Sequence, residues 1–267
     1  MQLRPAAVAG RFYPGDAASL RAAVERLAPE SAVASRGLAV LAPHAGWVYS
    51  GAVAAETYAR VVVPKHVVVL CPNHTGLGSS RALFAGDGFQ IPGAVVPVAR
   101  RLARVLGDEC GLDQDERAHL REHAIEVQLP LLLARQPALE IVPIVLGRAS
   151  LDDCLELGRN MARALDAFGS PTLVVASTDM SHYLPAERAR HLDAIALDRV
   201  LALDPEGLYR VVVEHEISMC GFIPATVALT TAVARGAKSA RLVRYANSGD
   251  VSGDYDAVVG YAGVVVS

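Results

Sequence analysis

Short apolar runs without polar alternation occur along this chain between longer stretches of helical periodicity. Runs of this kind, such as Val67 to Cys71, are typical of strands that are buried on both faces of a parallel sheet. We predict strands at residues 38–42, 66–71, 81–85, 140–146, 172–177, 240–246 and 257–266. Helices are predicted at residues 16–28, 50–62, 97–107, 121–135, 151–168, 186–202, 205–214 and 222–235, with Asp16 as the N-cap of the first.

This alternation predicts an α/β fold in which helices flank both faces of a central, mostly parallel or mixed sheet. Pro and Gly occur at the junctions between elements, and we find no linker-like segment and no repeat of fixed period. We therefore expect one domain over residues 1–267, an ordinary length for a single α/β domain.

Composition narrows the class of protein. Hydrophobic residues make up 52% and charged residues 20% of the chain, which excludes a disordered mode of action. The net charge is −3 and the arginines are dispersed, so we expect no nucleic-acid partner. The run at 257–266 is about half a membrane span, and the N-terminus has no signal-peptide core. We expect a cytoplasmic protein without a membrane partner.

Three histidines each follow a strand-like run: His44, His74 and His182. Ligands of open α/β sheets bind beyond the carboxyl ends of the strands, so this repetition points to a site at one sheet edge. In Ala42-Pro-His-Ala-Gly46, the proline ends the strand and the glycine permits a tight turn. A histidine that only caps a strand end by hydrogen bonding is the competing interpretation.

The loop Cys71-Pro-Asn-His-Thr-Gly-Leu-Gly78 repeats the arrangement of a proline before the histidine. Its Asn73 and glycines make a polar loop whose backbone amides could approach a ligand. Imidazole is the commonest metal-ligand side chain, and two at adjacent strand ends could reach one ion. Two unrelated loop histidines remain the alternative.

The third loop, Ser177-Thr-Asp-Met-Ser-His-Tyr183, places Asp179 three residues before His182. The carboxylate could orient the ring or serve as a ligand, or it could cap the helix that begins near Pro185. Cys220 precedes a helix N-terminus, where the helix dipole is expected to lower the pKa of a thiol. None of the four cysteines forms a Cys-x-x-Cys pair, which argues against a disulfide framework or zinc knuckle.

The segment Glu122-His-Ala-Ile-Glu126 places two carboxylates one helical turn apart, with His123 beside the same face. This cluster could form hydrogen bonds to the metal-ligating residues, or it could act as a general acid or base. It could equally be the exposed, salt-bridging start of a helix.

These motifs together resemble the Memo family, also called AmmeMemoRadiSam system protein B. The resemblance spans the chain and rests on Ala9-Gly-Arg-Phe-Tyr-Pro14, Ala42-Pro-His-Ala-Gly46 with Tyr49-Ser-Gly51, Pro72-Asn-His-Thr-Gly76, Glu122-His-Ala-Ile-Glu126, Ser177-Thr-Asp-Met-Ser-His182, Met219-Cys-Gly221 and Tyr245-Ala-Asn-Ser-Gly-Asp250.

The resemblance implies a fold similar to the class III extradiol dioxygenases, with a non-heme metal site. It makes His44, His74 and Cys220 the metal ligands, and places His182 and Asp179 in the same pocket as the catalytic pair. His123, Glu126, Asn73 and Tyr183 are expected around the ligands or the substrate.

The dioxygenases complete their site with a carboxylate, an arrangement suited to Fe(II), whereas a thiolate shifts preference towards copper or zinc. We therefore expect a divalent or redox metal, with Fe(II) favoured and copper or zinc as alternatives. The family name further implies AMMECR-type and radical SAM proteins as partners.

Three functions follow as hypotheses. The first is a dioxygenase-like, metal-dependent oxidoreductase. The second is a non-catalytic protein on the same fold that binds a peptide or a small ligand. In the third, Cys220 is the nucleophile of a thiol hydrolase and His182 is its base.

Overall fold

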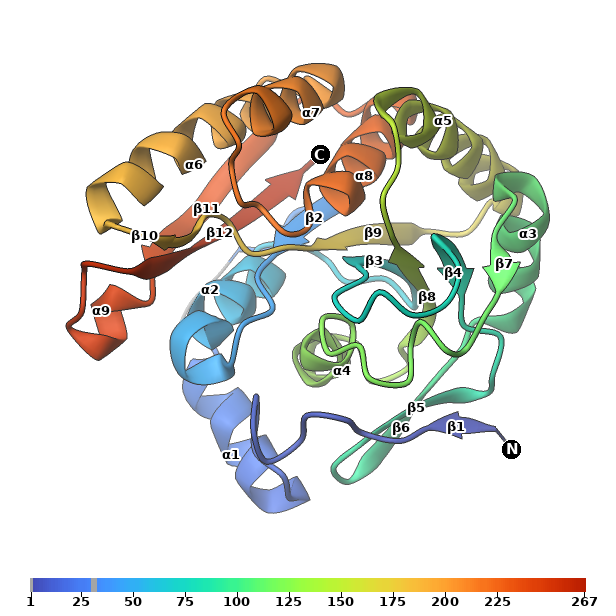
Figure 1. Cartoon of the computed structure of the whole chain (residues 1–267). Coiled ribbons are helices and arrows are strands. Elements are labelled where there is room, and N and C mark those ends of the chain that lie inside the picture. The colour runs from blue at the N-terminus through green and yellow to red at the C-terminus, as the bar shows by residue number, and fades with distance from the viewer. Residues whose placement is uncertain (1, 30–32) are drawn as a thin grey trace.

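A mixed sheet of nine strands forms the centre of the computed structural model, which describes residues 2–29 and 33–267. The strand order is β10-β12-β2-β9-β3-β8-β4-β7, with β11 paired to β12 (Figure 1). The four central strands run parallel: β2 (Ala39–Ala42), β9 (Thr172–Ser177), β3 (His66–Pro72) and β8 (Glu140–Leu146). The outer strands are β4 (Arg81–Leu83), β7 (Asp113–Gln114), β10 (His182–Leu184), β11 (Ala240–Asn247) and β12 (Val258–Val266).

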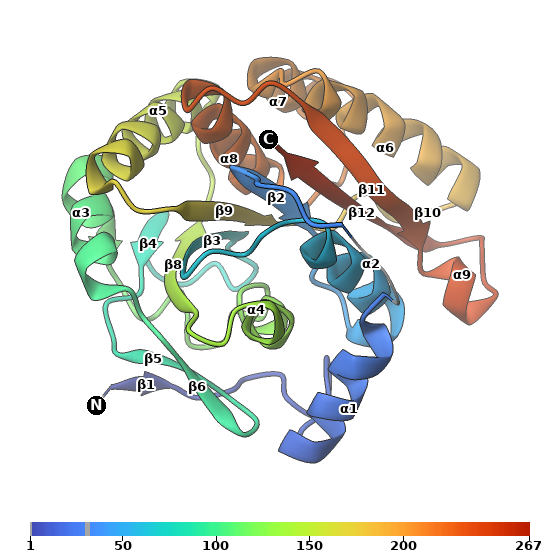
Figure 2. The ribbon, with the colours of Figure 1, turned by 180° about the vertical axis from the view of Figure 1, so that it is seen from behind.

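Helices cover both faces of this sheet, as Figures 1 and 2 show from opposite sides. Helix α8 (Phe222–Ala234) packs on β2, β3 and β9, and the same layer contains α3 (Arg100–Cys110), α5 (Leu151–Phe168), α6 (Ala186–Leu201) and α7 (Pro205–Glu214). The other layer contains α1 (Ala17–Leu27), α2 (Trp47–Ala59) and α4 (Leu129–Arg135). A short helix, α9 (Gly249–Ser252), precedes β12.

The central strands are buried over nearly their whole length, as expected for a sheet that carries helices on both faces. Every residue of β9 is buried, and Val67 to Leu70 of β3 expose no surface. This burial explains the unbroken runs of Val and Leu, and the α/β fold predicted from them is confirmed.

A second, three-stranded sheet was not predicted: β1 (Leu3–Arg4), β5 (Gly88–Ile91) and β6 (Ala94–Pro97). Strands β5 and β6 form a hairpin whose turn uses Gly93 at φ 82°, a conformation that glycine adopts without steric cost. Because β6 continues to Pro97, the following helix begins at Arg100 instead of residue 97. The short strands β7 and β10 and helix α9 were also missed.

The helix predicted at 121–135 is wrong in its first half. Only α4 and a 3-10 turn at Glu126–Gln128 are helical there. The guanidinium of Arg4 explains the difference, because it donates hydrogen bonds to the backbone carbonyls of His119 and Glu122. An α-helix over 121–135 would need the Glu122 carbonyl as the acceptor for the Glu126 N–H.

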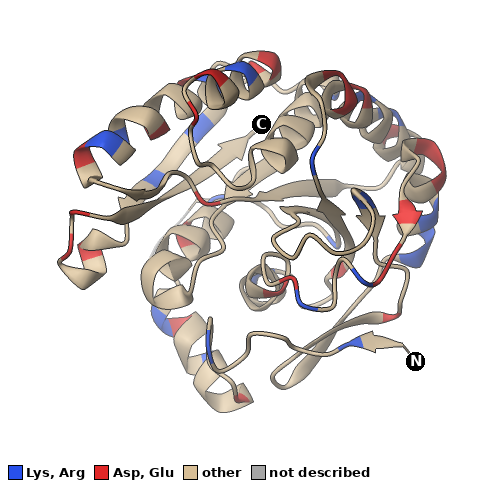
Figure 3. Cartoon of the chain, in the orientation of Figure 1, with Lys and Arg blue, Asp and Glu red and all other residues tan. Residues whose placement is uncertain are grey.

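Charged residues of both signs are interspersed along the outer helices and loops (Figure 3). Within the described ranges, no helix combines the length and apolar character required to cross a lipid bilayer.

Candidate metal centre

The carboxyl ends of three neighbouring parallel strands meet at one edge of the sheet. Strand β2 ends at Ala42, β3 at Pro72 and β9 at Ser177, and the histidine loops follow directly. The ring centroids of His44 and His74 lie 5.0 Å apart. The convergence predicted from the repeated motif therefore occurs for this pair.

A third imidazole, that of His123, completes a cluster with His44 and His74. Each residue offers one ring nitrogen, and these three atoms lie within 4.8 Å of one another. His123 enters from the turn before α4, and its ring stacks on that of His74 with centroids 4.7 Å apart. The sequence analysis expected His123 around the ligands or the substrate, and not as a ligand, because the helix predicted at 121–135 gave no reason for its ring to face the strand ends.

The Glu122 carboxylate contacts the rings of His74 and His123. Its buried carboxylate accepts hydrogen bonds from the backbone N–H of His74 at 2.8 Å and from its Nδ1 at 2.9 Å. It also accepts from the backbone N–H of Ala124 at 3.0 Å, and His123 Nδ1 lies 3.3 Å away. Burial would raise the pKa of Glu122, but the hydrogen bonds and the facing imidazoles lower it to about 2.

An ionised carboxylate only accepts hydrogen bonds, so His74 donates to it from Nδ1, and Nε2 is the ring nitrogen that Glu122 does not bind. Such carboxylate–histidine pairs fix the ring orientation and tautomer of metal ligands. Burial, reinforced by nearby His44, lowers the pKa of His123 to about 4, so this ring is neutral near pH 7.

A hydrogen bond with Ser177 fixes the tautomer of His44. The Ser177 hydroxyl donates its proton to the Ala124 carbonyl at 2.7 Å, so at 3.0 Å from His44 Nδ1 it accepts from the ring. Gln128 Nε2 donates to the same hydroxyl at 2.8 Å. His44 therefore carries its proton on Nδ1, and burial lowers its pKa to about 3. The bare Nε2 of a neutral imidazole is the form that binds a metal ion.

Cys220 lies beside this ring. Its Sγ is 3.3 Å from His44 Nε2 and accepts a hydrogen bond from the Asp179 N–H at 3.3 Å. Gly221 permits the approach, because a Cβ there would lie 2.5 Å from Thr178 Cβ. Burial and the neighbouring Asp179 raise the pKa of the Cys220 thiol, so the predicted lowering by the helix dipole is wrong for this metal-free geometry.

Asp179 turns towards the His44 loop. Its Oδ1 accepts from the backbone N–H of His44 at 2.8 Å, and burial raises its pKa against that hydrogen bond. It does not cap α6, whose N-cap is Pro185. The ring of His182 is held instead by Ser218, whose carbonyl lies 2.9 Å from Nδ1.

The remaining predicted residues have different surroundings. Glu126 binds Arg4 and accepts from the Tyr13 hydroxyl at 2.7 Å, so its contacts are with the N-terminal segment. Asn73 shapes its own loop, accepting from the N–H groups of Thr75 and Gly76. Tyr183 stands at the cavity mouth with 78% of its surface exposed.

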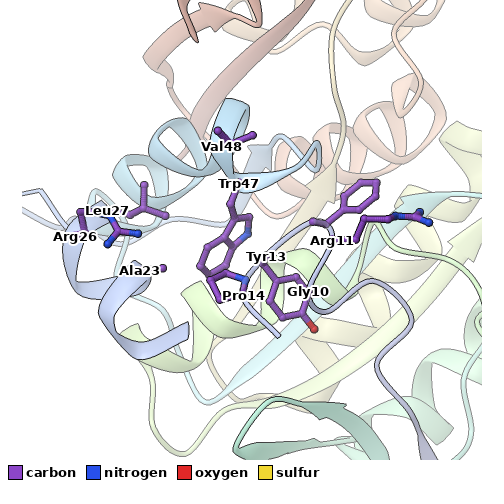
Figure 4. A pocket seen from close by; sticks show the side chains of 10 residues that line it. Gly10, Arg11, Tyr13, Pro14, Ala23, Arg26, Leu27, Trp47 and Val48 are labelled. Carbon is purple, nitrogen blue, oxygen red and sulfur yellow. The ribbon is translucent and has the colours of Figure 1, made fainter. Parts of the chain in front are cut away.

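A cavity of about 610 Å³ lies over the histidines. Its lining includes His44, His74, His123, Asp179, His182 and Tyr183, so most of the predicted site residues share one space. A second cavity of about 500 Å³ lies beside it and shares Phe12. Figure 4 shows this second cavity, with Trp47, Tyr13, Arg11 and Arg26 around it.

Comparison with known proteins gives the family. The family model described as "Memo-like protein" matches residues 4–265. The chain belongs to the Memo family. It is 40% identical over 270 residues to a MEMO1 family protein of Aquifex aeolicus, with 99% of each chain covered. It is 39% identical to a MEMO1 family protein of Methanopyrus kandleri, with 98% of each covered.

A solved structure has a similar fold. The chain matches the crystal structure of an uncharacterized protein, JW3007, from Escherichia coli K12 with a TM-score of 0.59. The match covers 86% of this chain and 100% of the other at 12% identity, so it concerns the fold alone. The Memo-family resemblance inferred from the motifs is confirmed, and this neighbour agrees with the mixed α/β architecture.

Proposed function

We propose that this Memo-family protein holds a non-heme metal ion at the strand-end histidines and is a metal-dependent oxidoreductase. The observation that carries the proposal is the cluster of His44, His74 and His123, whose ligand nitrogens lie within 4.8 Å of one another. Hydrogen bonds with Glu122 and Ser177 engage Nδ1 of His74 and of His44, which leaves Nε2 of each ring as the nitrogen that would bind an ion. Cys220 Sγ lies 3.3 Å from His44 Nε2, beside the proposed ion.

His44 and His74 are the two proposed ligands that both the family resemblance and the histidine cluster support. Two side chains compete for the third position: Cys220, as the family resemblance implies, and His123, which lies in the cluster. The choice bears on the metal, because imidazoles suit iron, copper and zinc alike, whereas a thiolate favours copper or zinc. We favour Fe(II) because of the resemblance to dioxygenases, with copper or zinc as alternatives.

When bound, such an ion would supply one-electron chemistry and a position for an oxygen ligand. The chain's own residues would orient the substrate and handle protons. His182 lines the cavity with its Nδ1 against the Ser218 carbonyl, so Nε2 is available to accept or deliver a proton. Asp179 holds the His44 loop in place through the backbone N–H.

Metal analysis of protein purified without added metal tests the ligand set. We expect His44→Ala and His74→Ala to lose the bound ion, and His191→Ala, which changes an exposed histidine of α6, to retain it. Loss in Cys220→Ser or in His123→Ala identifies the third ligand. Full metal content in His44→Ala contradicts the proposed centre.

The oxidoreductase part needs a separate measurement. Oxygen uptake by Fe(II)-loaded protein in the presence of a phenol or catechol supports it, and His182→Gln is expected to slow the uptake without loss of metal. A site that takes only zinc and gives no uptake with any redox metal counts against oxidoreductase activity.

A second candidate function comes from the contact between Cys220 and His44. The imidazole within reach of the sulfur, at 3.3 Å, is His44, so a thiol-hydrolase mechanism would use His44 as base instead of His182. Labelling of Cys220 by iodoacetamide in metal-free protein, lost in His44→Ala but kept in His182→Ala, would favour this function.

The non-catalytic alternative makes a different prediction. Ligand binding in the cavity would then be unchanged after removal of metal by a chelator, and no turnover would accompany it. The AMMECR-type and radical SAM partners and the cytoplasmic location stay predictions. Co-purification from a native host would test the partners.

A further inference from the structure

The second cavity, of about 500 Å³, lies where the loop at residues 10–14, helix α1 and the first turn of α2 meet. Its lining is mostly apolar and includes Tyr13, Pro14, Ala23, Leu27, Trp47 and Val48. The charged side chains among the described lining residues are two arginines, and no carboxylate lines it. A cavity with apolar walls and cationic groups limits the chemistry of the ligands that it can bind.

The polar atoms of the two aromatic rings in this wall are engaged within the protein. Trp47 Nε1–H donates to the Val127 carbonyl at 3.1 Å, and the Tyr13 hydroxyl donates to Glu126 at 2.7 Å. The two rings are buried, with centroids 5.7 Å apart. Because these hydrogen bonds use the polar atoms of both rings, the rings present apolar surface to the cavity. A ligand group that packs there without loss of hydrogen bonds to water has no polar atoms.

Arg26 supplies an unpaired positive charge beside this wall. It is exposed and lies in the last turn of α1. Within the described part of the chain, its guanidinium has no ion-pair partner. Its neighbour Glu25 lines a different cavity, and Asp16 caps the opposite end of the helix. The charge of Arg26 is therefore available to an anionic ligand.

Arg11, the other cationic residue of the lining, is engaged differently. Its guanidinium lies 5.2 Å from the centroid of the Phe12 ring, which is within the range of a cation–π contact. Figure 4 shows Arg26 and Leu27 on one side of Trp47, and Arg11 on the other side, extending away from that ring. Arg26 is thus the guanidinium that adjoins the apolar wall.

We propose that this second cavity binds a medium-chain aliphatic carboxylate. The alkyl chain packs against Trp47, Tyr13 and Leu27, and the carboxylate pairs with the guanidinium of Arg26, whose planar fork matches a carboxylate. A cationic amphiphile would instead face an arginine without any carboxylate in the lining. The inference goes beyond the proposed function and does not depend on it, because neither Trp47 nor Arg26 lines the histidine cavity.

The fluorescence of Trp47 reports occupancy of this cavity, because Trp47 is the one tryptophan of the chain. Metal-free protein is titrated with octanoate, octanol and octylamine, which share an alkyl chain and differ in charge, below the concentrations at which they form micelles. We expect a saturable change with octanoate and an affinity at least about fivefold higher than for octylamine, about 1 kcal/mol. The absence of a saturable change with octanoate, or equal affinity for octylamine, overturns the proposal.

Arg26→Gln is expected to weaken octanoate binding about fivefold, with octanol binding unchanged, because only the carboxylate uses the guanidinium. Arg21→Gln is the matched control, because it removes the same charge from the same exposed helix and Arg21 does not line this cavity. Full octanoate affinity in Arg26→Gln, or an equal loss in Arg21→Gln, overturns the role of Arg26. A loss confined to Arg11→Gln also overturns it.

Repeating the octanoate titration with Zn²⁺ present separates this cavity from the proposed metal centre. We expect the Trp47 response and the octanoate affinity to stay the same, whether or not the protein takes up the ion. An octanoate affinity that rises with bound Zn²⁺ would place the carboxylate on the ion and overturn the proposal. The metal content measured on the same samples tests the metal centre independently.

Discussion

Replacement of Glu122 by glutamine is expected to weaken metal binding without any loss of a metal ligand. The carboxylate accepts from the His74 backbone and ring and from the Ala124 N–H, at distances of 2.8 to 3.0 Å. A glutamine retains one acceptor oxygen and turns an NH2 group towards these donors. One or two buried N–H groups would lose their partner, and each costs about 1–3 kcal/mol.

We therefore expect Glu122→Gln to lower the free energy of unfolding of metal-free protein by about 2–4 kcal/mol, measured by urea denaturation. Metal affinity should fall about 10-fold to 100-fold, since His74 and His123 lose the group that orients them. Competition with a chromophoric chelator, under conditions where both proteins are folded, measures that affinity.

Glu126→Gln is the control for this experiment. Glu126 is equally buried four residues away, and accepts from the Ala7 N–H at 2.8 Å and the Tyr13 hydroxyl at 2.7 Å. Its replacement should destabilise the fold to a similar extent and leave the metal affinity of folded protein unchanged. The reasoning is refuted if Glu122→Gln binds metal within twofold of the parent, or if both variants lose affinity equally.

Three further predictions concern the fold. Gly260→Ala should destabilise the protein by about 1–3 kcal/mol in urea denaturation, because its Cβ would lie 2.1 Å from Asp193 Oδ2; a stability within 0.5 kcal/mol of the parent, as is usual for surface changes, would contradict the clash. Asp16→Ala should lower the thermal stability, because the Asp16 side chain caps α1 by accepting a hydrogen bond from the Ser19 N–H at 2.9 Å; unchanged thermal stability would refute this prediction. Burial lowers the pKa of His119 to about 4, so the unfolded chain binds its proton first as pH falls. Stability should therefore drop between about pH 6.5 and pH 4, and the drop measured for the parent should be shallower in His119→Phe.

The buried strands and most long helices could be predicted from the sequence because one physical condition governs each of them. A strand covered on both faces needs an unbroken apolar run, and β8 and β9 begin and end where their runs do. Helix α5 likewise spans 151–168 as predicted, between the capping box of Ser150 and the left-handed Gly169. These signals are local, so the sequence carries them in full.

Elements governed by partners far away in the chain could not be predicted. The non-helical turn at Glu122 depends on the N-terminal segment, from which Arg4 donates a hydrogen bond to the Glu122 carbonyl. No pattern within residues 121–135 shows that partner. The same loss of helix turns His123 towards the strand ends. The hairpin of β5 and β6, by contrast, has a local signal in its Pro92-Gly93 turn that the sequence analysis did not use.

The sequence by itself determined where the site lies, since the carboxyl ends of adjacent parallel strands share one edge and His44 and His74 follow two of them. The sequence could not show which hydrogen-bond partners and protonation states these side chains have. Only the tertiary structure places Glu122 behind two rings, Ser177 behind the third and Cys220 beside His44, because hydrogen-bond partners across the chain set tautomers, burial and pKa values. The sequence pattern of strands determines which residues lie at the carboxyl-end edge of the sheet. Packing between segments that are distant in the chain determines which of their atoms face one another there.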